Sequence, residues 1–322
     1  MLIRQSYVSQ GKRVTSSWIY VIDRWYDPIT YYQLTITIRR IIVTMIKITA
    51  KKIIIAVAIM AVGLGSAFVG CKRESGARIV IKGSTTVLPI TQKAMEAYRQ
   101  NHNVSITIEG SGSGNGIKAI LDGSTDIANA SRQMKPKELA AAQQKNIAIE
   151  EIVCAYDMIV PVIHPSNPVT NLTTAQLKGI YEGTITNWKQ VGGQDSEIVV
   201  ISRDTSSGTY EYWYEEVMKK KDVRQDSLLQ ASNGAVVSAV AGNAKAIGYI
   251  GFGYLNDTVK ALNVNGVQAT IENGKSRTYP ISRGLYMYVN KTTLSQEARD
   301  FINFILGPEG QKIVKEAGYI PL

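Results

Sequence analysis

Short apolar runs alternate with segments of helical periodicity along the chain from residue 78 onward. Runs rich in Val and Ile are typical of buried strands, whereas apolar residues three or four positions apart indicate helices. The predicted strands are residues 78–81, 104–108, 126–130, 198–201, 246–250 and 286–289. The predicted helices are residues 87–100, 117–121, 173–182, 210–217, 233–240, 295–306 and 308–317, with an Ala-rich helix from Pro136. This alternation predicts an α/β fold with largely parallel sheets.

One apolar run, residues 149–163, is too long for an ordinary strand and is interrupted by Asp157 and Pro161. We expect it to leave one lobe and enter another. The junctions between strands and helices lie at the carboxyl ends of the strands, where open α/β sheets place their ligands. Two lobes joined by crossing strands would bring those edges face to face.

Three of these junctions have the same chemistry. Ser84-Thr85-Thr86, Ser111–Gly116 and Ser206-Ser207-Gly208-Thr209 each precede a predicted helix. Their hydroxyls are hydrogen-bond donors, and their glycines allow the backbone to approach a ligand closely. A single such junction indicates no more than a helix N-cap. Three in one chain, together with Ser131-Arg132 and Arg203, favour a site for a small oxyanion.

The charge available at these junctions matches a dianion. A helix N-terminus behaves like about half a positive charge, so three of them and Arg203 supply roughly +2.5. The planar guanidinium of Arg203 suits phosphate-like oxygens. Asp204 would orient it or accept a proton from the ligand. The alternative for Arg203-Asp204 is a solvated turn.

The formal net charge of +10 raises the possibility of a nucleic-acid partner. Residues 1–70 carry nine Lys and Arg against two acidic residues, whereas the other 252 carry 27 against 24, a balance of only +3. No basic patch with interleaved aromatic residues remains, so no nucleic-acid partner is predicted.

The sequence does not match the motifs of a P-loop, a nucleophile elbow, a histidine-activated nucleophile or a metal site. Lys82 precedes Gly83, which is the wrong order for a phosphate-binding P-loop, and Ser111 and Ser113 are out of phase with a nucleophile elbow. His102 and His164 do not neighbour a candidate nucleophile, and no His, Cys and Asp cluster has metal-ligand spacing. We therefore predict no enzyme activity, no catalytic residue, no metal and no cofactor.

Residues 45–71 have the order of a bacterial secretion signal: Lys47, Lys51 and Lys52, then an apolar stretch, small residues and Cys71. A cysteine at the cleavage point resembles a lipoprotein signal, which predicts a lipid anchor on Cys71. The alternative is a transmembrane anchor, although about 17 apolar residues are marginal for that. A start at Met45 would make residues 1–44 a gene-model artefact. Cys154 would then be a buried, unpaired cysteine.

The motifs together resemble the periplasmic phosphate-binding proteins of bacterial phosphate ABC transporters, which have the type II solute-binding fold. The resemblance covers residues 77–322. It is carried by residues 83–89, 112–118, 126–132, 186–188, 203–209 and 246–249.

This resemblance implies a monomer with two lobes, each a sheet flanked by helices, that close over dehydrated inorganic phosphate. Lobe I would comprise residues 72–157 and 285–322, and lobe II residues 158–284. The partner would be an ABC permease in the cytoplasmic membrane, and the protein would lie in the periplasm or at the cell surface. The implied phosphate-binding residues are Ser84, Thr85, Thr86, Val87, Ser113, Ser131, Arg203, Ser207, Gly208 and Thr209.

One position departs from the family pattern. Ser131 stands where some members have an aspartate, whose charge repels fully ionised sulfate. Preference for phosphate over sulfate is therefore open. The alternatives are a binding protein for sulfate, molybdate or tungstate, and a phosphate sensor. A secreted phosphohydrolase is disfavoured because its catalytic groups are missing.

Overall fold

The computed structural model describes residues 36–37 and 78–322. The predicted signal peptide at 45–70 and Cys71 lie outside the described residues, as does all of segment 1–44 except residues 36–37. Within the described ranges, no helix combines the length and apolar character needed to cross a membrane.

Most strands belong to one continuous sheet. Their order is β2-β1-β3-β11-β4-β8-β6-β7, with β9 paired to β4. The strands of this sheet are β1 (Arg78–Gly83), β2 (Ser105–Gly110), β3 (Ile127–Ala130), β4 (Ile149–Ile163), β6 (Val199–Arg203), β7 (Leu228–Gln230), β8 (Ala246–Gly251), β9 (Lys260–Ala261) and β11 (Ser282–Asn290). Two short strands pair separately: β5 (Asn171–Leu172) and β10 (Asn263–Val264).

The sheet is parallel at its two ends and antiparallel in the middle. β1 runs parallel to β2 and β3, and β6 runs parallel to β7 and β8. β4 and β11 are antiparallel to each other, and each is antiparallel to its other neighbour. The expectation of largely parallel sheets was therefore wrong for the middle strands. The reason is that β4 leaves one end of the sheet and β11 returns to it. We call these two the crossing strands.

The helices begin largely where the sequence predicts. Pro136 opens α4, and the Ser295 hydroxyl caps α9 by accepting from the Ala298 N–H at 3.2 Å. The helices are α2 (Leu88–Tyr98), α3 (Ser113–Leu121), α4 (Pro136–Gln144), α5 (Thr174–Glu182), α6 (Gly208–Glu216), α7 (Asn233–Ala241), α8 (Ile271–Lys275), α9 (Gln296–Leu306) and α10 (Pro308–Glu316), with short 3-10 turns at Trp188–Val191 and Phe252–Tyr254.

Helix α3 departs from the prediction, because it begins at Ser113 and not at Ile117. The glycine-rich run is thus the first turn of a helix, not a loop. A Cβ at Gly116 would lie 2.6 Å from the Gly83 Cα, so glycine is needed there for close packing against β1.

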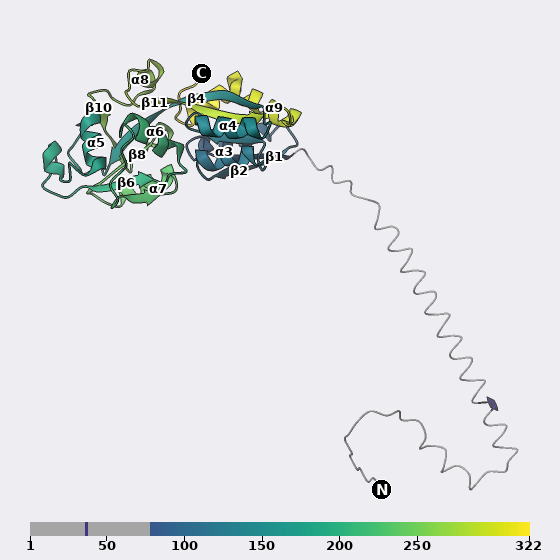
Figure 1. Ribbon diagram of the computed structural model, residues 1–322, viewed down its shortest axis with the longest axis horizontal. Helices are drawn as coiled ribbons and strands as arrows, with labels where there is room; N and C mark the ends of the chain where they lie inside the picture. The colour runs from purple at the N-terminus through teal and green to yellow at the C-terminus, as the bar shows by residue number, and fades with distance from the viewer. Residues whose placement is uncertain (1–35, 38–77) are drawn as a thin grey trace, which may run out of the picture. The chain divides into compact units, whose positions relative to one another are not determined.

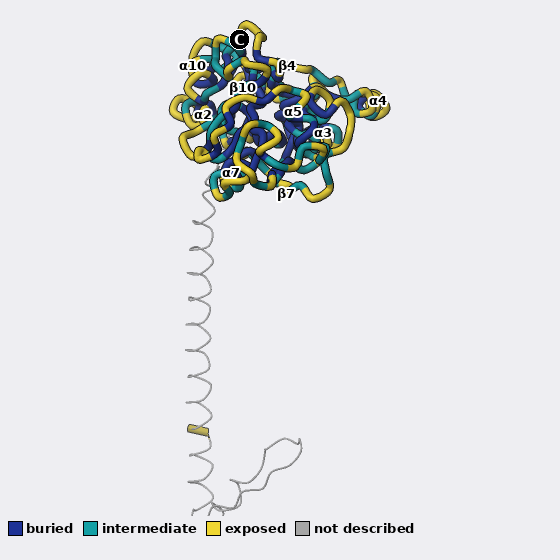
Figure 2. The backbone as a smooth tube through the Cα atoms, turned by 90° about the vertical axis from the view of Figure 1, so that its left-hand side faces the viewer, coloured by how far each residue is buried: buried dark blue, intermediate teal, exposed yellow. Residues whose placement is uncertain are grey.

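Of the three clusters of buried apolar residues in the described part of the chain, the two largest contain residues from opposite ends of β4. One contains Ile79, Ile90 and Phe301 from β1, α2 and α9, and the other contains Tyr181, Trp213 and Tyr249 from α5, α6 and β8. We call the elements around them the first half and the second half. Figure 1 shows β1, β2, α3, α4 and α9 gathered in the first half, and α5, β6, α7 and β8 in the second. In Figure 2 the buried backbone is concentrated inside, under an exposed surface.

Strand β4 changes core along its length. Cys154 and Ala155 belong to the first core, whereas the strand from Met158 onward belongs to the second. Asp157, which is fully buried, lies at the change. The prediction for Cys154 is confirmed: it is an unpaired, fully buried cysteine.

Candidate anion-binding site

The three predicted junctions form helix N-termini in the structure. The Ser84 hydroxyl accepts from the Thr86 N–H at 3.1 Å, just before α2. The Ser207 hydroxyl caps α6 by accepting from the N–H groups of Thr209 and Tyr210, both at 3.2 Å. A hydroxyl that accepts in this way still has its own O–H to donate. These serines are therefore fixed in place and remain able to donate to an anion.

Hydroxyls from the two halves meet directly. The Oγ1 atoms of Thr86 and Thr209 are 3.1 Å apart, although the residues are separated by 123 positions. Within the first half, the Ser113 Oγ lies 3.3 Å from the Ser131 Oγ and accepts from the Ser131 N–H at 3.0 Å. The Gly208 backbone approaches this serine pair so closely that a Cβ there would lie 2.3 Å from the Ser113 Oγ. Five predicted residues thus converge where the halves face each other.

The other predicted residues of the first loop support this cluster. Thr85 is buried, and its carbonyl oxygen accepts from the Tyr254 hydroxyl at 2.6 Å. The Val87 side chain is fully buried in the first core, so only its backbone is available to a ligand. Ser84, Thr85 and Val87 make no side-chain contact with the Ser113–Ser131 pair among the hydrogen bonds of the described residues.

Arg203 is buried and only partly satisfied. Its side chain is 1% exposed, and its Nε and Nη2 donate to the carbonyl oxygens of Gln230 and Ala231, both at 3.0 Å. The Nη1 has no hydrogen-bond partner in the described part of the chain. Burial lowers the pKa of Arg203, and the nearby charge of Arg283 contributes in the same direction. An anion bound at Nη1 would stabilise the charged form of Arg203 and so counteract this lowering of its pKa.

Comparison with other arginines shows what distinguishes Arg203. Arg132 and Arg224 each leave one nitrogen unpartnered too, but each pairs closely with a carboxylate, Glu138 or Asp226. The nearest carboxylate to Arg203 belongs to Asp204, at 3.9 Å. Asp204 instead holds its own turn by accepting from the Ser206 N–H at 2.9 Å and from the Ser206 hydroxyl. The positive charge of Arg203 is therefore weakly compensated.

Sequence reasoning missed several residues of the cluster. The Asn233 side chain donates to Thr86 at 3.0 Å and to Thr85 at 3.3 Å, which links the halves. Asn233 follows the N-cap Ser232 of α7, so it belongs to a fourth junction that the same criterion would have found. Arg283 and Asp157 carried no such signal, because they lie within strands.

No group of three or more His, Cys, Asp and Glu residues within 36–37 and 78–322 is arranged to hold a metal ion. The two histidines lie elsewhere, since His102 stacks on Tyr98 at 3.8 Å and His164 contacts Ser166 at 2.7 Å. The groups that the structure does provide are clustered hydroxyls, backbone N–H groups at helix N-termini and the buried guanidinium of Arg203, all of which suit an oxyanion.

Comparisons with known proteins agree with this chemistry. A family model described as a PBP superfamily domain matches residues 72–309. The chain is 33% identical over 283 residues to the phosphate-binding protein PstS of Borreliella burgdorferi, covering 84% of this chain and 98% of that one. It is also similar to the structure of a putative phosphate ABC transporter substrate-binding protein with bound phosphate from Clostridium perfringens. That similarity has 40% identity and a TM-score of 0.72, and covers 76% of this chain and 99% of that one. A third relative is an ABC-type phosphate transport receptor from Vibrio cholerae, at 35% identity and a TM-score of 0.64, which covers 76% of this chain and all of that one (100%).

Proposed function

The chain belongs to the PBP superfamily and, within it, to the substrate-binding proteins of phosphate ABC transporters; from this premise we propose how it holds its anion. It binds phosphate for transport by an ABC transporter, and it is a binding protein, not an enzyme. The alternatives of another oxyanion and of a sensor are not favoured by the comparisons.

The proposed phosphate site is the cluster where the halves meet. Hydroxyls of Thr86 and Thr209 would donate from opposite halves, and the Ser113–Ser131 pair and the Gly208 backbone would line one side. Ser84, Ser207 and the backbone of Thr85 and Val87 would add donors at the helix N-termini. The observation that carries this proposal is the buried Arg203: among the described residues its Nη1 has no hydrogen-bond partner, and the nearest carboxylate, that of Asp204, is 3.9 Å away.

The two halves are, in this proposal, the two lobes, with boundaries at residues 72–157 and 285–322 for lobe I and 158–284 for lobe II. The separate cores and the change of core within β4 support this division. Closure of the lobes would bring Thr86 and Thr209 onto the anion and exclude water, which strengthens each charged hydrogen bond.

We further propose that the protein works outside the cytoplasmic membrane as a monomer and delivers phosphate to an ABC permease. Residues 45–70 would be the signal peptide, and a lipid on Cys71 would hold the protein at the membrane. Mass spectrometry of the protein from its native membrane tests this, because a lipidated Cys71 at the N-terminus is expected and any peptide from residues 1–44 would contradict it.

Calorimetry tests the site. Titration of the full chain with phosphate, sulfate and molybdate should show binding of phosphate most tightly. Arg203→Ala should weaken phosphate binding at least about tenfold, because a charged hydrogen bond contributes ~1.5–3 kcal/mol. The control is Arg299→Ala, which removes an arginine paired with Glu150 outside the proposed site. Equal phosphate affinity in Arg203→Ala and wild type would show that Arg203 does not bind phosphate and that the site lies elsewhere.

A further inference from the structure

A second buried arginine, Arg283, lies where the two halves meet. It stands near the start of the crossing strand β11 and is 5% exposed. Its Nε and Nη2 donate to the Asp157 Oδ2 at 3.1 Å and 2.8 Å. Its Nη1 donates to the Ser131 carbonyl oxygen at 3.1 Å. The guanidinium is therefore held in one orientation by β4 and by the end of β3.

Asp157 is itself fixed. It is fully buried on the other crossing strand, and its Oδ1 accepts from the Phe252 N–H at 2.9 Å. Its backbone belongs to β4, the strand that contributes to both cores, so both its backbone and its carboxylate are held where the halves join. The Asp157–Arg283 pair thus forms a rigid polar element between the two cores.

One N–H of Arg283 is directed between the halves. The Nη2 atom lies 3.4 Å from the Thr86 Oγ1 and 3.1 Å from the Thr209 Oγ1. Since Nη2 has two hydrogens and one is used by Asp157, the other faces these two hydroxyls. Both threonines belong to the proposed phosphate site, one from each half. These hydroxyls are 3.1 Å apart, so an anion oxygen bound by both would replace the Thr86–Thr209 hydrogen bond and would meet the Arg283 N–H.

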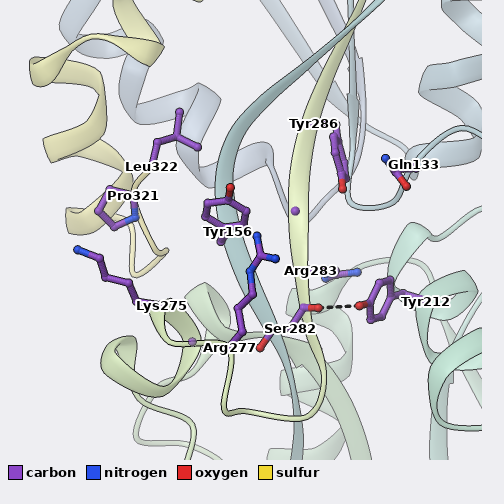
Figure 3. A pocket seen from close by; sticks show the side chains of 12 residues that line it. Gln133, Tyr156, Tyr212, Lys275, Arg277, Ser282, Arg283, Tyr286, Pro321 and Leu322 are labelled. Carbon is purple, nitrogen blue, oxygen red and sulfur yellow. Dashed lines mark hydrogen bonds between the residues drawn. The ribbon is translucent and has the colours of Figure 1, made fainter.

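Arg283 also lines a cavity of about 540 Å³, drawn in Figure 3. Tyr156, Tyr212 and Arg277 also line it. The Tyr212 ring lies 6.0 Å from the Arg283 guanidinium, and its hydroxyl donates to the Ser282 carbonyl oxygen at 2.6 Å. Arg283 therefore lines this cavity and also contacts the hydroxyls of the cluster.

We propose that Arg283 is a further phosphate-contacting residue, which donates from the crossing strand to an anion oxygen held between Thr86 and Thr209. This inference rests on the proposed function, since it assigns a new residue to the same site. Asp157 positions the guanidinium and offsets its charge. Two guanidinium groups, from Arg203 and Arg283, then face one anion.

The test is phosphate calorimetry on full-length variants. Removing Arg283 alone would leave Asp157 as a lone buried charge, so the first variant is the double substitution Asp157→Asn with Arg283→Met. We expect it to bind inorganic phosphate at least about tenfold more weakly than wild type, since it lacks a charged donor. The matched control is Glu150→Gln with Arg299→Met, another pair between an arginine and β4, joined at 2.6 Å. The control should retain phosphate affinity within about twofold.

The single variant Arg283→Lys separates a contact with the anion from a merely structural pair. It keeps a positive charge beside Asp157 but removes the planar fork that reaches both Asp157 and the hydroxyls of Thr86 and Thr209. We expect phosphate affinity to fall at least about tenfold while the unfolding temperature without phosphate stays close to wild type. Wild-type phosphate affinity in Arg283→Lys would overturn the proposal even if the double variant failed to fold. A folded double variant that binds phosphate as tightly as wild type would also overturn it. Absence of phosphate binding by the wild-type chain would contradict the proposed function itself. The variant results above would contradict only the proposed contact between Arg283 and the anion.

Discussion

Replacing Gly208 by alanine would put a methyl group against the opposite half of the molecule. Gly208 is the first residue of α6 in the second half, and the Ser113–Ser131 pair belongs to the first. A Cβ at position 208 would lie 2.3 Å from the Ser113 Oγ, 2.7 Å from the Ser131 Oγ and 2.9 Å from the Ser113 Cβ. Rotation of the Ser113 hydroxyl would relieve the first contact but not the last. The halves must therefore separate for the variant to be accommodated.

The required separation is enough to break a contact across the halves. Restoring an ordinary carbon–carbon distance of about 3.5 Å from 2.9 Å needs a shift of roughly half an ångström. The same shift would lengthen the Thr86–Thr209 contact from 3.1 Å to about 3.6 Å, beyond a normal hydrogen bond. Loss of one or two donors to a charged ligand costs about 1.5–3 kcal/mol, which corresponds to roughly 10- to 100-fold in phosphate affinity.

The assay is calorimetry with phosphate, together with small-angle scattering and thermal unfolding without phosphate. We expect weaker binding and a more open chain in Gly208→Ala, with an unfolding temperature close to wild type, because the clash acts between halves and alanine is a good helix former. Gly234→Ala is the control, since it too lies in the first turn of a helix, α7, and its nearest neighbours would be 3.9 Å away. Wild-type affinity in Gly208→Ala would refute closure of the two halves at this point.

Two further predictions concern groups away from the phosphate site. Burial raises the pKa of the Cys154 thiol to about 12. Iodoacetamide at about pH 8 should therefore leave Cys154 unmodified in the native protein and modify it in denaturant, which the mass of its peptide would show. Rapid labelling of the native protein would contradict the burial of Cys154. The pKa of Glu138 is lowered below 4.5, because although burial raises it, the hydrogen bonds from Arg132 and the Lys135 N–H outweigh that effect. The contribution of Glu138 to the free energy of unfolding is therefore present above pH 4.5 and is lost as the pH falls through the lowered pKa. Glu138→Gln should make the free energy of unfolding depend less on pH in the acid range. An unchanged pH dependence would show that the Arg132–Glu138 pair does not stabilise the fold.

Much of the fold is encoded locally. Runs of Val and Ile predict β1 and β6, and helix starts follow from residues such as Pro136 and Ser295, whose effects act within one turn. The same holds for the junction serines, because a hydroxyl that accepts from N–H groups two or three residues later depends on nothing distant. Such short-range rules placed Ser84, Ser207 and the helix N-termini of the candidate site.

The candidate site itself is assembled from contacts that the sequence pattern does not encode. Asp157 and Arg283 are 126 residues apart, and a charged residue inside a strand gives no periodic signal of its partner. Asn233 reaches Thr86 over 147 residues, so the sequence indicates its place at the start of α7 but not its partner. The antiparallel middle of the sheet arises in the same way, since pairing between β4 and β11 depends on where the chain returns.

The sequence by itself determined the elements, the oxyanion chemistry of the junctions and the presence of Arg203, because capping, hydrophobic periodicity and charge are properties of neighbouring residues. Only the tertiary structure decided that Thr86 meets Thr209, that Gly208 packs against the Ser113–Ser131 pair, and that Arg283 lies between the halves. The physical reason is that β4 and β11 set how the two cores face each other, and every contact across the cluster depends on that placement.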